Sequence, residues 1–295
     1  MKDKIDLHIH TTFSDGVYSP KQIIDMAIKN GVSTISIADH DTIEAYTLDF
    51  FDYAIKNGVN LIPAVEMSTK YDGIGIHVLG YNIDLKNKEL IQTLNLLKNA
   101  RKEYLINVSK KLNELGYKLN MDKLKEFPSV TKAHIALDIV GNVENKNILI
   151  KEFGHIPSKG EFIEAIMNEG CIAYVEKYSI TPKKASEIIK KAGGKVILAH
   201  PVAYVHIDNL KVEKIDELVK EMNADGIEAN YMYINRNNEL INESLFWNKY
   251  AIENNLMVTA GSDFHTIDGI HPTIGFSNYD FEPINVNLND LLKEK

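Results

Sequence analysis

Short apolar segments alternate with helical segments over the first 85 residues of the chain. The predicted strands are, in order, "KIDLHIH" (4–10), "STISIADH" (33–40), "VNLIPAVEMST" (59–69) and "IHVLGYNI" (76–83). Helical segments that end at Gly31 and Gly58 separate the first three strands, and Ser19-Pro20 supplies an N-cap followed by proline. Strands that alternate with helices predict βαβ units and a parallel sheet, which is the α/β fold class.

The pattern becomes mostly helical between residues 86 and 179. A long amphipathic helix is predicted at 88–115, and shorter helical segments follow around 121–126, 132–140 and 159–169. The alternation then returns, with strands at "KVILAHP" (195–201), "DGIEAN" (225–230) and "LMVTAGSDFH" (256–265), and a helix from about 237 to 254. We therefore expect one α/β domain built from 1–85 and 180–295, with a helical insertion or cap domain at 86–179.

The first strand is unusual because only one of its faces is apolar. Side chains alternate between the two faces of a strand, so Asp6, His8 and His10 share the face opposite the apolar residues. His8 and His10 then lie about 7 Å apart on the same side. Two ligands of one cation fit this spacing, and a pair of hydrogen-bonded core histidines is the alternative for this segment alone.

Histidine and carboxylate side chains recur at the predicted strand ends. The nine candidate ligands are His8, His10, Asp15, His40, Glu66, His77, His200, Asp263 and His265. In parallel α/β folds, sites are built at the carboxyl ends of the strands. An uncompensated buried charge costs several kcal/mol. Nine histidine and carboxylate side chains gathered at one end of the sheet therefore predict a common metal centre, whose cations would compensate the buried charge.

The types of ligand also restrict the metal. Imidazole and carboxylate without thiolate suit manganese, iron or zinc, and the single cysteine, Cys171, excludes a cysteine zinc cluster and an internal disulfide. Nine ligands exceed what one tetrahedral ion needs. We expect two or three divalent ions bridged by Glu66, with Mn²⁺ as first choice and Fe²⁺ or Zn²⁺ as alternatives. Such centres suit hydrolytic attack on phosphorus.

Composition and charge exclude several other functions. No apolar run approaches the length of a membrane span, and the N-terminus does not resemble a signal peptide, so we expect a cytoplasmic protein without membrane association. The net charge of −8 argues against stable binding of duplex nucleic acid. Residues 86–191 nevertheless carry 19 basic and 13 acidic side chains, against 14 and 28 elsewhere. This basic segment would attract an anion, although chance clustering on solvated helices gives the same count.

Six motifs resemble, in order and in strand context, those of the PHP family, the polymerase and histidinol phosphatase family. They are "DLHIHTTFSDG", "IADHDT", "AVEMS", "HVLGY", "LAHP" and "GSDFH", within residues 4–84 and 185–276. The segments "TKAHIALDIV" and "AGGKVILAHP" are more similar to the subgroup of nucleotide phosphatases and 5'-3' exoribonucleases than to stand-alone histidinol phosphatases.

The resemblance implies a distorted (β/α)7, TIM-like barrel with a trinuclear metal site. One ion would be held by His8, His10, Glu66 and Asp263, a second by Glu66, His77 and His200, and a third by Asp15, His40 and His265. Asp263, His200 and Glu66 are therefore expected to be catalytic. All nine positions are present, which argues against a degenerate, non-catalytic copy.

Five further residues are expected to bind substrate: Lys132, His134, Lys177, Glu228 and Arg236. Related sequences commonly carry arginine where Lys132 stands, and lysine lacks the bidentate fork of arginine. A surface role is the alternative for the basic residues. For Glu228 the alternative is orientation of a ligand from behind, a role also expected of Asp39.

These residues predict a phosphoric ester hydrolase that cleaves phosphomonoesters of nucleotides by metal-hydroxide attack on phosphorus. The expected partner is an anionic small molecule or short oligonucleotide: a nucleoside 3',5'-bisphosphate, a 5'-mononucleotide or a short 5'-phosphorylated RNA. Histidinol-phosphate phosphatase is the alternative. It is disfavoured because histidinol phosphate carries an ammonium group, which the net positive charge of the helical insertion would repel. A non-catalytic metal-binding scaffold is the third hypothesis. The sequence makes no prediction of oligomeric state.

Overall fold

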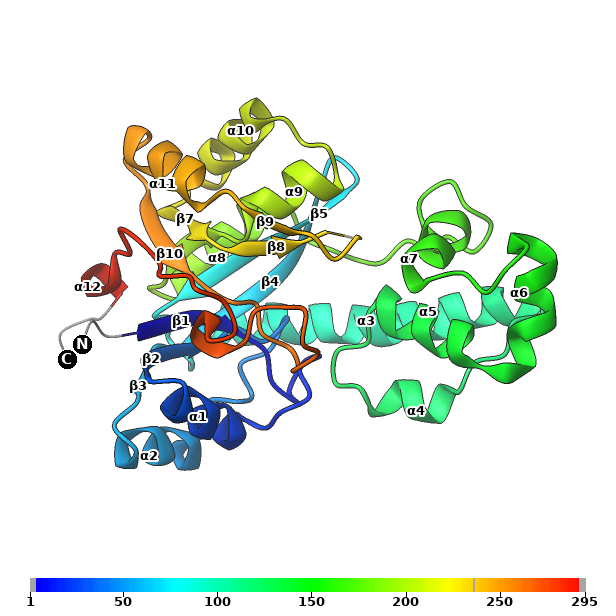
Figure 1. Cartoon of the computed structure of the whole chain (residues 1–295), viewed down its shortest axis with the longest axis horizontal. Coiled ribbons are helices and arrows are strands. Elements are labelled where there is room, and N and C mark those ends of the chain that lie inside the picture. Colours follow the sequence, from blue (N-terminus) through cyan, green and yellow to red (C-terminus); the bar gives the residue numbers. More distant parts are fainter. Residues whose placement is uncertain (1–3, 236, 292–295) are drawn as a thin grey trace. The chain divides into compact units, whose positions relative to one another are not determined.

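The computed structural model describes residues 4–235 and 237–291, so the predicted substrate contact Arg236 lies outside the described residues (Figure 1). The chain divides into two compact units. We call Met1–Asn95 together with Ile180–Lys295 the α/β unit, and Leu96–Ser179 the helical unit. The long helix α3 (Lys88–Glu114) contributes residues to both. None of the described helices is long and apolar enough to cross a membrane.

The described residues of the α/β unit form three sheets. The first has the order β1-β2-β3 and is parallel, with β1 at Lys4–Ile9, β2 at Val32–Ile37 and β3 at Asn60–Leu61. The second has the order β10-β7-β6-β5-β4; its strands are β4 (Ala64–Tyr71), β5 (Ile74–Tyr81), β6 (Lys195–Leu198), β7 (Gly226–Asn230) and β10 (Met257–Ala260). The third is a hairpin of β8 (Met232–Ile234) and β9 (Leu240–Asn242).

The other regular elements of this unit are helices. They are α1 (Pro20–Lys29), α2 (Leu48–Lys56), α8 (Pro182–Lys191), α9 (Pro201–Ile207), α10 (Val212–Met222), α11 (Ser244–Glu253) and α12 (Leu288–Leu291), with the short 3-10 helix η3 (Ile274–Phe276). Figure 1 shows α1 and α2 side by side next to the first sheet, and Ile23, Ile35 and Phe50 belong to the buried cluster there. A second buried cluster joins side chains of β1, β4, β5, β6 and β10, including Leu7, Leu79 and Ile197.

The mixed α/β class is confirmed, but the strands do not close into the predicted (β/α)7 barrel. No continuous ladder joins the first sheet to the second among the described residues. Two isolated parallel bridges, Ile9–Phe264 and His40–Glu66, connect the two sheets. The second sheet, which was expected to be parallel, is mixed. The tight turn at Asp72-Gly73 makes β5 antiparallel to β4, and β5 is also antiparallel to β6.

Several predicted elements differ from the observed ones. The predicted strand 59–69 is divided into β3 and β4, which are separated by Ile62 and Pro63; proline has no backbone N–H for a ladder. The helix expected at 237–254 begins only at Ser244, because the β8–β9 hairpin occupies the preceding residues. The helix expected at 159–169 is shorter, with α7 at Lys159–Phe162 followed by one π-helical turn at Ile163–Met167.

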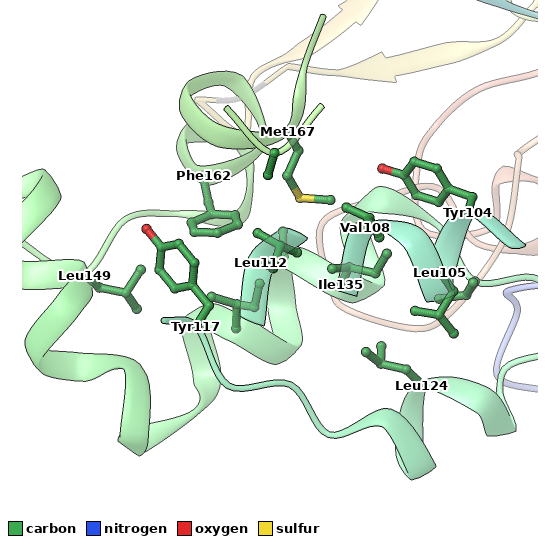
Figure 2. Packing of buried hydrophobic residues seen from close by; sticks show 14 residues of the cluster. Tyr104, Leu105, Val108, Leu112, Tyr117, Leu124, Ile135, Leu149, Phe162 and Met167 are labelled. Carbon is green, nitrogen blue, oxygen red and sulfur yellow. The ribbon is translucent and has the colours of Figure 1, made fainter. Parts of the chain in front are cut away.

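The helical unit has its own hydrophobic core. Besides part of α3 it contains α4 (Met121–Glu126), α5 (Lys132–Gly141), a 3-10 turn at Val143–Asn145, α6 (Lys146–Phe153) and α7. Figure 2 shows Leu112 of α3, Ile135 of α5 and Met167 among the packed side chains. The ring of Tyr117 meets that of Phe162 edge-on, with centroids 5.1 Å apart. This core has no side chain from the α/β unit among its buried members.

A tyrosine hydroxyl links β2 to β4, two strands that form no ladder with each other in the described part of the chain. The hydroxyl of Tyr46 accepts hydrogen bonds from the backbone N–H groups of Ile37 (3.0 Å) and Ala64 (2.8 Å). Its single proton is within hydrogen-bond distance of two carbonyl oxygens, that of Ile37 at 2.7 Å and that of Ile62 at 3.0 Å. One side chain therefore satisfies backbone groups that a continuous sheet would pair.

Tyr46→Phe should lower the free energy of unfolding by about 1–3 kcal/mol, because it leaves these backbone groups without their partner. Urea unfolding followed by circular dichroism measures the change. Tyr53→Phe is the matched control, since the hydroxyl of Tyr53 binds only Asp25 at the surface, and it should change stability by less than about 0.5 kcal/mol. Equal stability of both variants would contradict the role of Tyr46.

Candidate metal centre

The nine predicted ligands converge on one end of the α/β unit. β1 carries His8 and leads directly to His10, β4 carries Glu66, and β5 carries His77. The other five lie in the segments that follow β1, β2, β6 and β10: Asp15, His40, His200, Asp263 and His265. Except for His77, which the antiparallel β5 supplies from mid-strand, they lie on strands that share a parallel direction, or just beyond their carboxyl ends.

Glu66 lies at the centre of the group. Its Oε2 is 3.4 Å from Nε2 of His8, 3.3 Å from Nε2 of His10 and 2.9 Å from Nδ1 of His40. Its Oε1 is 2.9 Å from Nδ1 of His77 and 3.2 Å from Nε2 of His200. The two oxygens thus face different histidines, which is the arrangement of a bridging carboxylate.

Asp263 and Asp15 complete the group on two further sides. Oδ1 of Asp263 lies 3.5 Å from Nε2 of His8 and 3.1 Å from Nε2 of His10. Asp15 faces His265 at 3.3 Å, His10 at 3.5 Å and His40 at 3.7 Å. Each carboxylate therefore contacts at least two imidazoles.

Two of the histidines meet nitrogen to nitrogen. Nε2 of His8 and Nε2 of His10 are 3.2 Å apart, and both residues are fully buried. The Nδ1 atoms face other partners, Glu228 for His8 and Ser14 for His10. Two ring nitrogens at this distance need a proton or a cation between them. The contact therefore fits a pair of ligands to one ion.

The donor set fits divalent metal ions in a second respect. Four buried atoms of the centre form no hydrogen bond of acceptable geometry, although several of them have an imidazole or carboxylate nearby: Oδ1 of Asp15, Nδ1 of His40, Oε2 of Glu66 and Nδ1 of His200. Buried polar atoms without a partner are costly in a protein interior. Three combinations bring ligand atoms close enough for one ion: His10, Asp15, His40 and His265; His8, His10 and Glu66; and His40, Glu66 and His77.

These combinations differ in detail from the predicted sets. His40 takes part in two of them, and Asp263 and His200 take part in none. His200 nevertheless faces the same Glu66 oxygen as His77, and Asp263 faces His8 and His10. The structure thus brings all nine residues together.

The backbone is strained at two of the nine. His200 has φ of 27° and Asp263 has φ of 52°, a region that residues other than glycine seldom adopt. Such conformations cost about 1–3 kcal/mol each and persist where the surroundings impose them. Both residues lie in the turn that follows a strand, His200 after β6 and Asp263 after β10, so the strained turn directs the side chain back toward the centre.

Burial and charge shift the pKa values of the centre in opposite directions. Burial alone would lower the pKa of His10, but hydrogen bonds to Asp263 and Glu66 raise it to about 10. Burial would likewise lower the pKa of His8, but the charges of Glu228, Glu66 and Asp263 raise it well above its usual range. The pKa of Glu66 moves the other way, well below its usual range, because His77, His40 and His8 outweigh the effect of burial.

Buried carboxylates behind the ligands organise the loops that carry them. Asp39 accepts hydrogen bonds from the backbone and hydroxyl of Thr11 and from Ser14, whose hydroxyl also contacts His10. This supports the positioning role expected of Asp39. Asp6, on the same face of β1 as the two histidines, accepts from the backbone and hydroxyl of Ser262.

Two tyrosines at the centre were not predicted. The hydroxyl of Tyr231 donates to Oδ2 of Asp263 at 3.2 Å, and its ring lies 5.3 Å from that of His200. The hydroxyl of Tyr204 accepts a hydrogen bond from the backbone of His77. Tyr231 follows the predicted strand "DGIEAN" directly, and this position is the only sequence signal that would have suggested it.

The predicted substrate contacts have different surroundings. In the helical unit, Nζ of Lys132 donates to Asn168 at 3.0 Å, and His134 forms a capping box with Thr131 at the start of α5. Lys177 lies in the segment between the π-helical turn and α8. Glu228, in β7, is buried, and its carboxylate faces His8 and the backbone of His200. Its surroundings favour the expected orienting role over substrate contact.

The chain matches the PHP domain over residues 6–237. It is 31% identical to a 5'-3' exoribonuclease of Haemophilus influenzae, over 90% of this chain and 91% of that protein. It is 22% identical to a 3',5'-nucleoside bisphosphate phosphatase of Chromobacterium violaceum, over 88% of this chain and 87% of that protein. The chain therefore belongs to the PHP domain family. This confirms the predicted family and enzyme class, a metal-dependent hydrolase of phosphoric esters.

Solved structures show the same fold at lower identity. A protein from Bifidobacterium adolescentis, described as a metal-dependent phosphoesterase, aligns with a TM-score of 0.73 at 20% identity and covers 99% of this chain and 96% of its own. An amidohydrolase from Chromobacterium violaceum aligns with a TM-score of 0.75 at 20% identity, over 98% and 95% of the two chains. At these identities the likeness concerns the fold.

Binding of metal ions should release protons from the protein at pH 7. The raised pKa values of His8 and His10 favour an extra proton on this pair of imidazoles when no metal is bound, whereas a metal ligand must be neutral. Metal affinity should therefore increase as the pH rises. Calorimetric titration with Mn²⁺ in two buffers of different ionisation enthalpy measures the release, which we expect to be at least one proton per chain.

The matched control is His155→Ala, which removes an exposed histidine that pairs with Glu161. It should release the same number of protons as the unmodified protein. Binding heats that do not depend on the buffer would contradict the protonated state of His8 and His10 in the metal-free protein.

Proposed function

We propose that this PHP-family enzyme hydrolyses phosphate esters of nucleotides, with short 5'-phosphorylated RNA and nucleoside 3',5'-bisphosphates as its principal substrates. The observation that carries the proposal is the convergence of six histidines and two further carboxylates on Glu66. The similarity to an exoribonuclease over nine-tenths of the chain supports the choice of nucleotide substrates. 5'-Mononucleotides belong to the same class.

Within this proposal, each of the nine residues holds a divalent ion. His8, His10, Glu66 and Asp263 would hold the first, Glu66, His77 and His200 the second, and Asp15, His40 and His265 the third. When bound, such ions supply a water of lowered pKa as nucleophile and positive charge beside the phosphoryl oxygens. Mn²⁺ is the proposed metal, and Fe²⁺ and Zn²⁺ suit the same donors.

The exposure of the ligands indicates the side from which a phosphate approaches. The side chains of His77, His265 and Asp263 are 32%, 33% and 21% exposed, whereas that of Glu66 is 1% exposed. The buried carboxylate of Glu66 therefore faces the ions from the protein interior, on the side away from solvent. The three partly exposed ligands border the face that is open to substrate. The hydroxyl of Tyr231 donates a hydrogen bond to one of them, Asp263.

Lys132, His134 and Lys177 are proposed to contact the part of the substrate that is not hydrolysed. Their support is the position of the first two in "TKAHIALDIV" and the net positive charge of residues 86–191. Lysine and histidine would bind a second phosphate as point charges rather than through a bidentate fork. Arg236 is proposed for the same role from its sequence position alone.

Asp263→Asn should reduce turnover of nucleotide substrates more than about 100-fold, because loss even of a residue that only supports a metal ligand typically costs 10- to 100-fold. The assay measures phosphate and mononucleotide release by Mn²⁺-loaded protein. Its substrates are adenosine 3',5'-bisphosphate, AMP, a short 5'-phosphorylated RNA, the same RNA with a 5'-hydroxyl, and histidinol phosphate. Asp268→Asn, which removes the charge of a carboxylate that binds His271 in a nearby loop, is the matched control and should keep full activity.

Each outcome of this assay separates two hypotheses. Turnover of the nucleotides by the unmodified protein and by Asp268→Asn, but not by Asp263→Asn, supports the proposal. Cleavage of histidinol phosphate alone would overturn the choice of substrate. Bound metal without cleavage of any substrate would overturn hydrolysis and favour a non-catalytic scaffold.

A further inference from the structure

We propose that Glu228 is a positioning residue that holds two metal ligands, His8 and His200, in binding geometry at the same time. The inference rests on the proposed metal-dependent function, since it concerns how the protein shapes the first and second ion sites. Glu228 lies in β7, between β6, which leads to His200, and β10, which leads to Asp263. Its carboxylate is fully buried behind both histidines.

The first contact decides which nitrogen of His8 faces the centre. Nδ1 of His8 lies 3.1 Å from Oε1 and 3.2 Å from Oε2 of Glu228. An ionised carboxylate only accepts hydrogen bonds, so Nδ1 must carry the proton. The lone pair of the neutral ring then lies on Nε2, the atom that faces His10, Glu66 and Asp263. Glu228 thereby selects the tautomer that binds metal.

The second contact holds a strained turn. Oε2 of Glu228 accepts a hydrogen bond of 3.0 Å from the backbone N–H of His200, whose φ of 27° is unfavourable for a residue with a side chain. The same turn brings Nε2 of His200 to 3.2 Å from Oε1 of Glu66. A carboxylate that accepts this N–H offsets part of the cost of the conformation.

A glycine makes room for the arrangement. A Cβ atom at Gly261, which directly follows β10, would lie 2.2 Å from Cβ of His8 and 2.3 Å from Oε1 of Glu228. Any side chain there would displace the histidine from the carboxylate. The backbone after β10 is therefore shaped around the contact between Glu228 and His8, and not only around the ligand Asp263.

Glu228→Gln tests the inference because it keeps the size of the side chain and removes one acceptor. If the amide oxygen faces His200, the NH₂ group faces Nδ1 of His8 and favours the opposite tautomer, which places a hydrogen on Nε2. If the amide oxygen faces His8, the NH₂ group faces the backbone N–H of His200, and two donors oppose each other. In either orientation the NH₂ group opposes at least one N–H that the carboxylate accepts, because both oxygens of Glu228 lie near Nδ1 of His8 and one of them also faces His200.

We expect Glu228→Gln to fold and to bind Mn²⁺ about 10- to 100-fold more weakly, as measured by competition with a chelating dye. The second readout is the tautomer itself. In zinc-loaded protein labelled with ¹⁵N-histidine, and with His8 assigned by its loss in His8→Ala, the His8 ring should carry its proton on Nδ1. In Glu228→Gln that signal should shift toward the other tautomer or become averaged.

The matched control is Asp225→Asn, an acid-to-amide change just before the start of the same strand. Asp225 accepts a hydrogen bond from the backbone of Val196, at the opposite end of β7 from the metal centre. It should leave metal affinity and the His8 signal unchanged. Equal loss of affinity in both variants, or an unchanged affinity and His8 tautomer in Glu228→Gln, would overturn the positioning role.

Both readouts are independent of catalysis. If no nucleotide is hydrolysed but Glu228→Gln alters affinity and tautomer, the proposed function fails and the positioning role stands. If hydrolysis is observed but the variant binds metal as the unmodified protein does, the positioning role fails and the proposed function stands.

Discussion

The structure depends on the compensation of negative charge inside the α/β unit. Asp15, Glu66 and Asp263 meet at the centre, and Asp6, Asp39 and Glu228 lie behind it. A buried carboxylate must be paired or hydrogen-bonded to remain ionised. Those behind accept hydrogen bonds from backbone and hydroxyl groups, whereas those at the centre face imidazoles. The raised pKa values of His8 and His10 show that imidazoles can compensate by binding protons, and divalent cations bound at the centre would replace such protons.

The same requirement explains features of the fold that are otherwise unfavourable. Left-handed backbone at His200 and Asp263, and an interrupted seam between β2 and β4, each cost free energy. They lie at the end of the strands where the ligands converge. There the chain gives up regular pairing in order to direct polar side chains inward, and the hydroxyl of Tyr46 supplies hydrogen bonds that the missing ladder does not.

Much of this could be predicted from the sequence, because period-two alternation shows directly that His8 and His10 share a face of a strand. The α/β class and the convergence of the ligands follow from the same kind of local pattern. Long-range features do not. Tyr46 and Tyr231 act through hydroxyl groups whose partners lie on other strands and loops, and the direction in which Glu228 points depends on how closely β10 approaches β7. The β8–β9 hairpin is not evident from the sequence because the asparagine-rich segment between its strands lies shortly before α11. The predicted helix at 237–254 therefore includes part of the hairpin as well as α11.

The β4–β5 hairpin has a consequence for the order in which the centre is assembled. Glu66 and His77 are joined by a tight turn, so a short stretch of newly made chain already brings the central carboxylate next to one imidazole. Asp263 and His265 are encoded almost two hundred residues later, and only the docking of β10 brings them in. Local contacts form sooner than distant ones. A ribosome-bound chain that stops before β10 therefore contains the central carboxylate Glu66 but lacks Asp263 and His265. Binding of the full set of metal ions would thus require that β10 has been made and has docked.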